Sequence, residues 1–223
     1  MVTLKMAIIF LMEQIRTPFS LIWTIMSPTV LFFFLHFNEI ELHYGDTAWL
    51  GKQISWFVGY ISFSVVLFNY CLYLVGRRES GFIATFVHNM DGRLLFIRSQ
   101  LIASLIMSIL YVFFFILVVL TGFQASPDYQ IVMIILKSIY INAFMMVSLT
   151  FMASFRVTFQ TASTIYSVLI TVCMVSGIVS LKYNEGIVYW INQVNPIAIY
   201  STILQSDQEL SLMTIFFYSI MLI

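Results

Sequence analysis

The chain has 223 residues, of which 61% are hydrophobic and only 9% are charged, with ten basic residues balanced by ten acidic ones. A soluble domain carries about 25% charged residues, so this composition excludes a water-exposed globular surface and indicates a chain embedded in a lipid bilayer. The zero net charge gives no electrostatic reason to expect a nucleic-acid partner, and the two cysteines, Cys71 and Cys173, lie in apolar runs that argue against a disulfide framework.

Residues 1–16 are the first predicted element, an amphipathic helix. Its apolar side chains recur at spacings of four, three and four, at Leu4, Ile8, Leu11 and Ile15. Its charged side chains fall on the opposite side, at Lys5, Glu13 and Arg16. A helix of this kind lies in the inner interface of the membrane. The open alternative is a frayed or cytosolic N-terminus.

Five long apolar runs follow, at residues 19–37, 54–75, 101–123, 131–153 and 162–181. A sixth begins near Leu210 and is still apolar at Ile223. A helix needs about 20 mainly apolar residues to cross the roughly 30 Å hydrocarbon core, and only helices satisfy every backbone group at such lengths. The predicted fold is therefore an all-α integral membrane protein in which residues 17–223 form one domain of six transmembrane helices.

The last run, residues 210–223, has 14 residues, which at about 1.5 Å per residue is roughly 21 Å and too short for the core. We therefore expect the native polypeptide to continue for at least another turn or two and to finish with a Lys or Arg.

The basic residues of the connecting segments predict the orientation of the chain. Seven lie on one side of the predicted membrane, at Lys5, Arg16, Arg77, Arg78, Arg93, Arg98 and Arg156. Only Lys52 and Lys182 lie on the other side. Because basic loops stay in the cytoplasm, the sequence predicts a multi-pass protein of the cell membrane with both termini cytoplasmic.

The outer segment 186–204 is apolar but carries Asn192, Gln193 and the Asn195-Pro196 pair. Such polar groups are costly at mid-membrane, and the residue before a proline disfavours the helical conformation. We expect two short helices that dip into the outer leaflet between spans five and six and bend at Asn195-Pro196.

The sequence gives no indication of a catalytic, metal or nucleotide-hydrolysing site. No phosphate-binding loop occurs, since Gly51-Lys52 is followed by Gln53, and the three histidines are scattered over both sides. All ten acids lie outside the predicted spans, which weighs against an ion-coupled transporter. Lys137 lies inside the fourth span, either as a cation facing a translocation cavity or as a lysine whose amine reaches the outer interface.

The segment between spans two and three is the most informative part of the sequence. Phe82, Ile83 and Phe86 have helical spacing, and the following turn ends near Asp91, which suits the cap of the next helix. The pattern predicts a short helix across the cytoplasmic face with aromatic side chains and basic ends. It suits a protein contact and, equally, an interfacial helix whose arginines bind lipid phosphates.

This order of elements resembles the permeases of the type-2 ABC transporter class over the whole chain. The stretch Arg78-Glu79-Ser80-Gly81-Phe82-Ile83 resembles the family's Arg-Glu-x-Gly-Thr-Leu, with Phe82 in place of the usual small polar residue. Ser176-Gly177 and Asn195-Pro196 resemble its Ser-Gly and Asn-Pro landmarks. The resemblance implies that the segment between spans two and three is a coupling helix that contacts an ATPase through Arg77, Arg78, Glu79, Gly81, Phe82, Ile83, Phe86 and Asp91.

The same resemblance implies the transmembrane subunit of an exporter. Two permease chains, identical or related, would form the substrate pathway in the bilayer, and a separate cytosolic ABC ATPase subunit would bind ATP and Mg. The chain itself would hold no cofactor. The cargo would be an amphipathic peptide, a drug or a lipid-like molecule. The alternative is a membrane sensor or accessory subunit that transports nothing.

Overall fold

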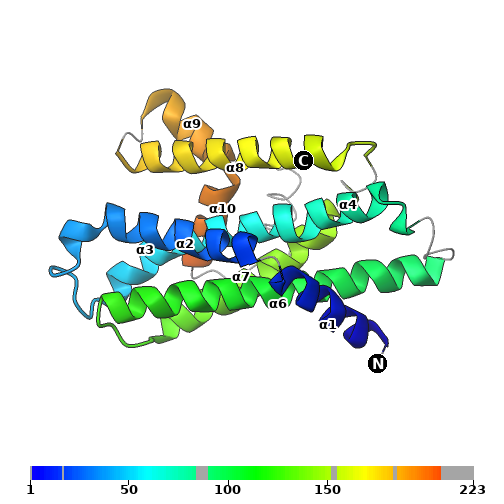
Figure 1. The fold of residues 1–223 in the computed structure, drawn as a ribbon. Coiled ribbons are helices and arrows are strands. Elements are labelled where there is room, and N and C mark those ends of the chain that lie inside the picture. The colour runs from blue at the N-terminus through cyan, green and yellow to red at the C-terminus, as the bar shows by residue number, and fades with distance from the viewer. Residues whose placement is uncertain (1, 17, 84–89, 152–154, 183–184, 207–223) are drawn as a thin grey trace.

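The computed structural model describes residues 2–16, 18–83, 90–151, 155–182 and 185–206, and every regular element in these ranges is helical (Figure 1). The first half contains α1 (Val2–Ile15), α2 (Pro18–Leu35), the 3-10 turn η1 (Phe37–Glu39), α3 (Thr47–Ser64), the π-helix η2 (Val65–Leu72) and α4 (Tyr73–Glu79). The second half contains α6 (Met90–Gly122), α7 (Tyr129–Leu149), α8 (Phe159–Lys182), α9 (Gly186–Val194) and α10 (Pro196–Gln205).

Four helices in these ranges are long and apolar enough to cross a membrane. Elements α3, η2 and α4 form one continuous helix, Thr47–Glu79, and the others are Met90–Gly122, Tyr129–Leu149 and Phe159–Ser180. They coincide with the predicted second to fifth spans. The predicted first span falls on α2, an apolar helix of 18 residues. The predicted sixth span, and with it the expectation about Ile223, lies outside the described residues.

The helix boundaries differ from the predicted ones. The second spanning helix begins at Thr47 and ends at Glu79 rather than at residues 54 and 75, and α6 begins at Met90 rather than 101. Hydropathy marks only the apolar part of a helix, whereas backbone hydrogen bonding continues through its polar flanks. The long helices therefore extend beyond the predicted apolar runs, the central helix at both of its ends and α6 at its start.

The helix Thr47–Glu79 lies at the centre of the bundle, with 83% of its apolar window buried, whereas only 28% of the corresponding window of α8 is buried. Helix α10 packs closely against α3 at Gly59, where a Cβ atom would lie 3.0 Å from the Cβ of Tyr200 and 3.1 Å from the carbonyl oxygen of Ile197. Helices α8 and α9 form an outer layer on one side of the bundle (Figure 1).

A buried polar chain joins α6, α7 and α10. The Tyr200 hydroxyl donates a hydrogen bond to Asn142 Oδ1 at a distance of 2.5 Å, and Asn142 Nδ2 donates one to Ser108 Oγ at 2.6 Å. All three side chains are at most 2% exposed. Side-chain hydrogen bonds between helices are typical of membrane bundles, so this chain fixes α10 against two spanning helices.

The connection between α2 and α3 carries Glu39, Glu41 and Asp46, and we call this end of the bundle the acidic end. Asp46 caps α3 by accepting the backbone N–H of Trp49 at 3.0 Å, and the ring of His43 stacks on that of Trp49 with 4.2 Å between centroids. The Trp49 backbone hydrogen bond, followed by one from His43, lowers the pKa of Asp46 from its ordinary value of 3.8.

Candidate functional site at the basic end of the bundle

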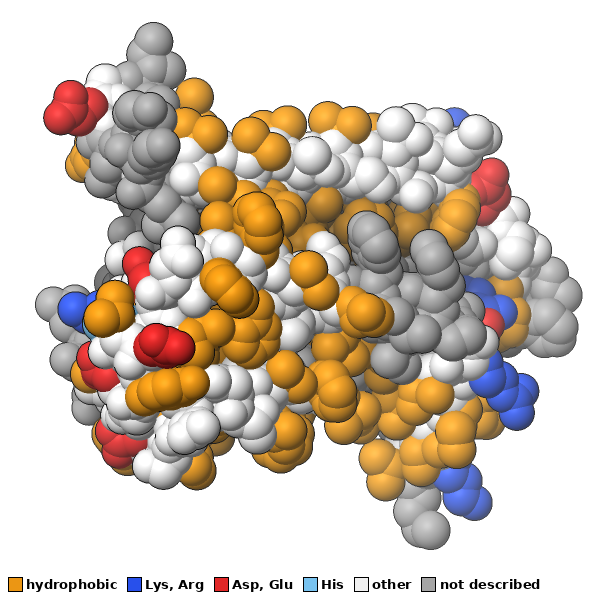
Figure 2. Space-filling view, turned by 60° about the vertical axis from the view of Figure 1, so that its left-hand side comes forward, with side chains coloured by type: hydrophobic (Ala, Val, Ile, Leu, Met, Phe, Trp, Pro, Cys, Tyr) orange, Lys and Arg blue, Asp and Glu red, His pale blue; other side chains and the backbone are white. Residues whose placement is uncertain are grey.

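Charged side chains are segregated along the bundle, as most of the visible acidic groups gather toward one end and most of the basic groups toward the other (Figure 2). Thr47 Oγ1 donates to Asp128 at 3.4 Å, which places the start of α3 beside the α6–α7 connection at the acidic end. At the other end, Arg77 binds Glu13 of α1, and Arg78 binds the segment before α8. The predicted site residues on α4 therefore lie where α1 and α8 meet the central helix.

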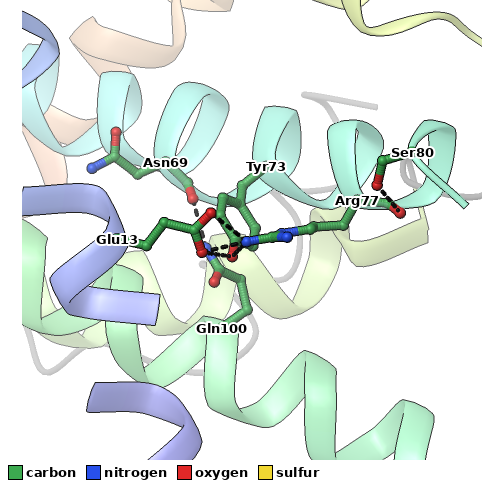
Figure 3. A network of polar contacts seen from close by, with 6 residues as sticks. All are labelled: Glu13, Asn69, Tyr73, Arg77, Ser80 and Gln100. Atoms are coloured by element: carbon green, nitrogen blue, oxygen red, sulfur yellow. Dashed lines mark hydrogen bonds and ion pairs between the residues drawn. The ribbon is translucent and has the colours of Figure 1, made fainter. Parts of the chain in front are cut away.

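Arg77 joins α4 to the N-terminal helix. Its guanidinium forms an ion pair with the carboxylate of Glu13 and donates to the Tyr73 hydroxyl at 2.8 Å, and this hydroxyl donates to Glu13 at 2.8 Å (Figure 3). The three side chains form a closed triangle. Sequence reasoning missed Glu13 and Tyr73 as partners, although Glu13 is the only acidic residue among the first 16.

The packing face of α1 also differs from the apolar stripe that the sequence suggested. Ala7 and Phe10 are buried, whereas Leu4, Ile8 and Ile15 are 57%, 47% and 41% exposed. Helix α1 packs on α6, with Phe10 against Phe96. Of the predicted stripe, Leu11 also packs against the core, whereas the other three side chains are exposed.

Gly81 and Phe82 follow α4 after its C-cap residue, Ser80. Gly81 has a φ of +72°, which L side chains rarely adopt, and its N–H donates to the Arg78 carbonyl at 3.1 Å. The Gly81 conformation ends the helix. The ring of Phe82 lies 5.1 Å from the Arg77 guanidinium carbon and 5.8 Å from the ring of Phe96.

Phe82 and Ile83 are both partly buried against the core, so they present less apolar surface to a partner than the sequence pattern suggests. Phe86 lies outside the described residues. Asp91 lies in the first turn of α6, where a carboxylate stabilises the positive end of the helix dipole.

Arg78 and Glu79 contact the segment that leads into α8. The Arg78 guanidinium donates to the carbonyl oxygens of Phe155 and Val157, and the Glu79 carboxylate accepts the backbone N–H of Phe159. The two residues in each of these contacts are separated by 77 to 80 positions in the sequence. In this structure, therefore, both charged side chains bind groups within the chain.

A π-helix lies one to two turns before these residues. In η2 the carbonyl oxygen of Asn69 accepts a hydrogen bond from Gln100 Nε2 of α6 at 2.8 Å (Figure 3). It also accepts one from Ser104 Oγ of α6 at 3.2 Å. Short segments of π-helix inside α-helices occur frequently at functional sites. The sequence carries no signal for it, since its residues are ordinary for a buried helix.

Lys137 lies on α7, and its side chain reaches the C-terminal end of α10. Its amine donates to the carbonyl oxygens of Leu204, at 3.3 Å, and Ser206. Leu204 lies in the last turn of α10 and Ser206 is its C-cap, a place where a cation is favourable. The sequence left two interpretations of Lys137, a cation facing a cavity and a lysine that reaches the interface. These contacts add a third, a cation that caps the C-terminal end of α10.

The two outer landmarks of the sequence lie together. Asn195 is 3% exposed, and its amide donates to the Cys173 carbonyl at 2.7 Å and to Ser176 Oγ at 3.1 Å. Its Oδ1 accepts the N–H of Ile197 at 3.0 Å and so caps α10. Asn195 therefore separates α9 from α10, as the sequence predicted, and holds this break against α8.

The chain was also compared with known proteins. No protein-family model matches it, and no solved structure matches its fold. The described geometry by itself defines a helical membrane protein whose central helix is tied at its basic end to α1 and to the start of α8.

Proposed function

We propose that this chain is the permease subunit of an ATP-driven exporter of the ABC type, with six spans, working with a second permease chain and a separate cytosolic ATPase. The observation that carries the proposal is the junction at Arg78–Gly81. A charged pair and a helix-ending glycine stand at the end of the central spanning helix. Arg78 and Glu79 contact the start of α8, and the neighbouring Arg77 contacts α1. A protein that binds the following segment would act on several helices at once.

The exposed face of α8 supports the second permease chain as a partner. A row of polar side chains follows this face at spacings of four, three and four, at Gln160, Thr164, Ser167 and Thr171. Residues of this kind are enriched where helices of a membrane protein pack together. In the proposed dimer, α8 faces the other chain and contributes to the pathway between them.

A shallow groove beside this row supports an apolar or amphipathic cargo. It has a volume of about 360 Å³ and lies between α8 and α9. Its lining is predominantly aliphatic, at Thr171, Val172, Val175, Ser176, Val179 and Ile191. A polyanionic cargo would find no cation in this lining.

The proposed cycle divides the work between subunits. The ATPase binds and hydrolyses ATP with Mg, and its closure displaces the segment after Gly81 in each permease chain. The helices tied to that segment then shift the pathway between inward-facing and outward-facing states, a rigid-body type of transition. The basic end faces the cytoplasm in this proposal, as the distribution of Lys and Arg favours.

The proposal is tested by purifying the tagged chain from its native membranes in mild detergent. We expect an ATPase subunit with a phosphate-binding loop to co-purify in equal amount. Phe82→Ala should weaken this association, because it removes the ring that packs between Arg77 and Phe96, whereas Phe114→Ala, on the exposed face of α6, should not. Purification of the intact chain without any ATPase subunit would instead favour the sensor or accessory subunit.

A further inference from the structure

The end of α4 and the start of α8 are joined by alternating contacts. Arg78 binds the carbonyls of Phe155 and Val157, and Glu79 binds the N–H of Phe159. Two consecutive side chains at the end of α4 thus bind alternate residues, two in the segment before α8 and one at its start. We call these five residues the α4–α8 clasp.

Close packing at Gly76 adds to the clasp. A Cβ atom at this position would lie 3.1 Å from the ring of Phe159, so the first side chain of α8 rests directly on the backbone of α4. The contact depends on glycine, because a larger side chain would displace the ring.

The electrostatics of the helix start also favour the clasp. The first N–H groups of a helix have no partner within the helix and carry a partial positive charge. The Glu79 carboxylate takes the N–H of Phe159, and the Thr158 hydroxyl takes that of Thr161 at 3.2 Å. Glu79 is therefore one of two caps of α8, although it belongs to a different helix.

Neighbouring arginines serve different helices. Arg77 binds Glu13 of α1, whereas Arg78 binds the segment before α8. Arg78 and Glu79 thus form the part of this junction that is directed to α8. They stand three and two residues before Gly81, so a displacement of the segment after Gly81 acts on them at once.

We propose that Arg78 and Glu79 are positioning residues that transmit movement of the segment after Gly81 to the first turn of α8, an inference that rests on the proposed function. Helix α8 suits this role because it is the least buried of the four long apolar helices in the described ranges, with 28% of its window covered against 83% for the central helix. It therefore has the fewest contacts within its own chain to break when it moves, and the clasp holds its cytoplasmic start to the helix that is displaced.

The test uses the complete complex of permease and ATPase, purified through a tag on the ATPase so that only assembled complexes are scored. A cysteine is introduced at Thr164, on the exposed face of α8, and its reaction rate with a soluble thiol reagent is measured with and without ATP and vanadate. The natural Cys71 and Cys173 are buried and contribute a low background. We expect nucleotide to change the rate in the otherwise native complex.

Arg78→Ala and Glu79→Gln should abolish this nucleotide-dependent change. Arg98→Ala, which removes an exposed arginine of α6 at the same end, should retain it, and Arg78→Lys should restore part of it. The inference is overturned if both clasp variants respond to nucleotide as the native complex does, or if Arg98→Ala loses the response equally. If the native chain co-purifies with no ATPase, the proposed function itself is refuted. This result differs from a failure of the inference about Arg78 and Glu79, in which the complex assembles but the variants respond as the native complex does.

Discussion

Replacing Lys137 by Met tests the position of its amine at the end of α10. The change keeps the length and most of the volume of the side chain but removes the donor for the carbonyls of Leu204 and Ser206. We expect the folded protein to lose stability because these two acceptors stay at the end of a largely buried helix with no charged donor.

Two magnitudes bound the expected loss for Lys137→Met. A hydrogen bond to a charged group contributes about 1.5–3 kcal/mol in soluble proteins, whereas interhelical bonds in a membrane protein average about 0.6 kcal/mol and reach about 1.7. Lys137 is only partly buried, so we take about 2 kcal/mol for both bonds together. At about 2–4 °C per kcal/mol for a chain of this length, the Tm should fall by roughly 4–8 °C.

The assay is thermal unfolding of the purified chain in one detergent, followed by tryptophan fluorescence. Lys137→Arg should recover most of the loss because it keeps a cation and several donors. Lys52→Met, which removes an exposed lysine from α3, is the matched control. A Tm for Lys137→Met equal to that of Lys52→Met would refute the cap, and a loss of transport at unchanged Tm would favour a cation in the pathway.

Three further predictions concern other parts of the chain. Gly59→Ala should lower the Tm, because overpacking typically costs about 1–3 kcal/mol and the nearest backbone atom of α10 would lie 3.1 Å from the new Cβ; Gly51→Ala on the same helix, whose nearest contact is 3.6 Å, should be tolerated. Asp46→Ala should lower the Tm at pH 7. Because the folded pKa of Asp46 is lowered, its contribution is complete above the ordinary value of 3.8 and disappears as the pH falls through the lowered value, so native and variant Tm should converge in acid. An impermeant thiol reagent applied outside cells should label a cysteine at Glu185 and not one at Thr158, and the reverse result would overturn the orientation.

Composition and hydropathy were sufficient to predict an all-helical membrane protein and the places of its long helices. A spanning helix is determined locally, because 20 or so apolar residues in lipid have no alternative to the helical backbone. The break at Asn195-Pro196 was predictable for the same reason, since proline restricts the residue before it and asparagine caps the helix that follows. The exact ends of the long helices were not predictable, because they lie in polar flanking residues that hydropathy does not mark.

The partners of the charged residues could not be read from the sequence. Arg78 and Glu79 were expected to face an ATPase, but they contact residues about 80 positions away, and this pairing depends on how α4 lies against α8. The carbonyl partners of Lys137 are 67 and 69 positions away and belong to a helix end, which carries no side-chain pattern to match. The partner of each charged side chain was set by tertiary packing, which the sequence pattern does not contain.

The most direct test of the permease assignment is ATP hydrolysis by the chain before and after it is separated from its membrane partners. The complex purified from native membranes should hydrolyse ATP, contain the ATPase and this chain in equal numbers, and lose hydrolysis when the ATPase is dissociated. Its rate in lipid nanodiscs should respond to an amphipathic cargo. Hydrolysis by the isolated chain, or a stable chain that never associates with an ATP-hydrolysing subunit, would contradict the assignment.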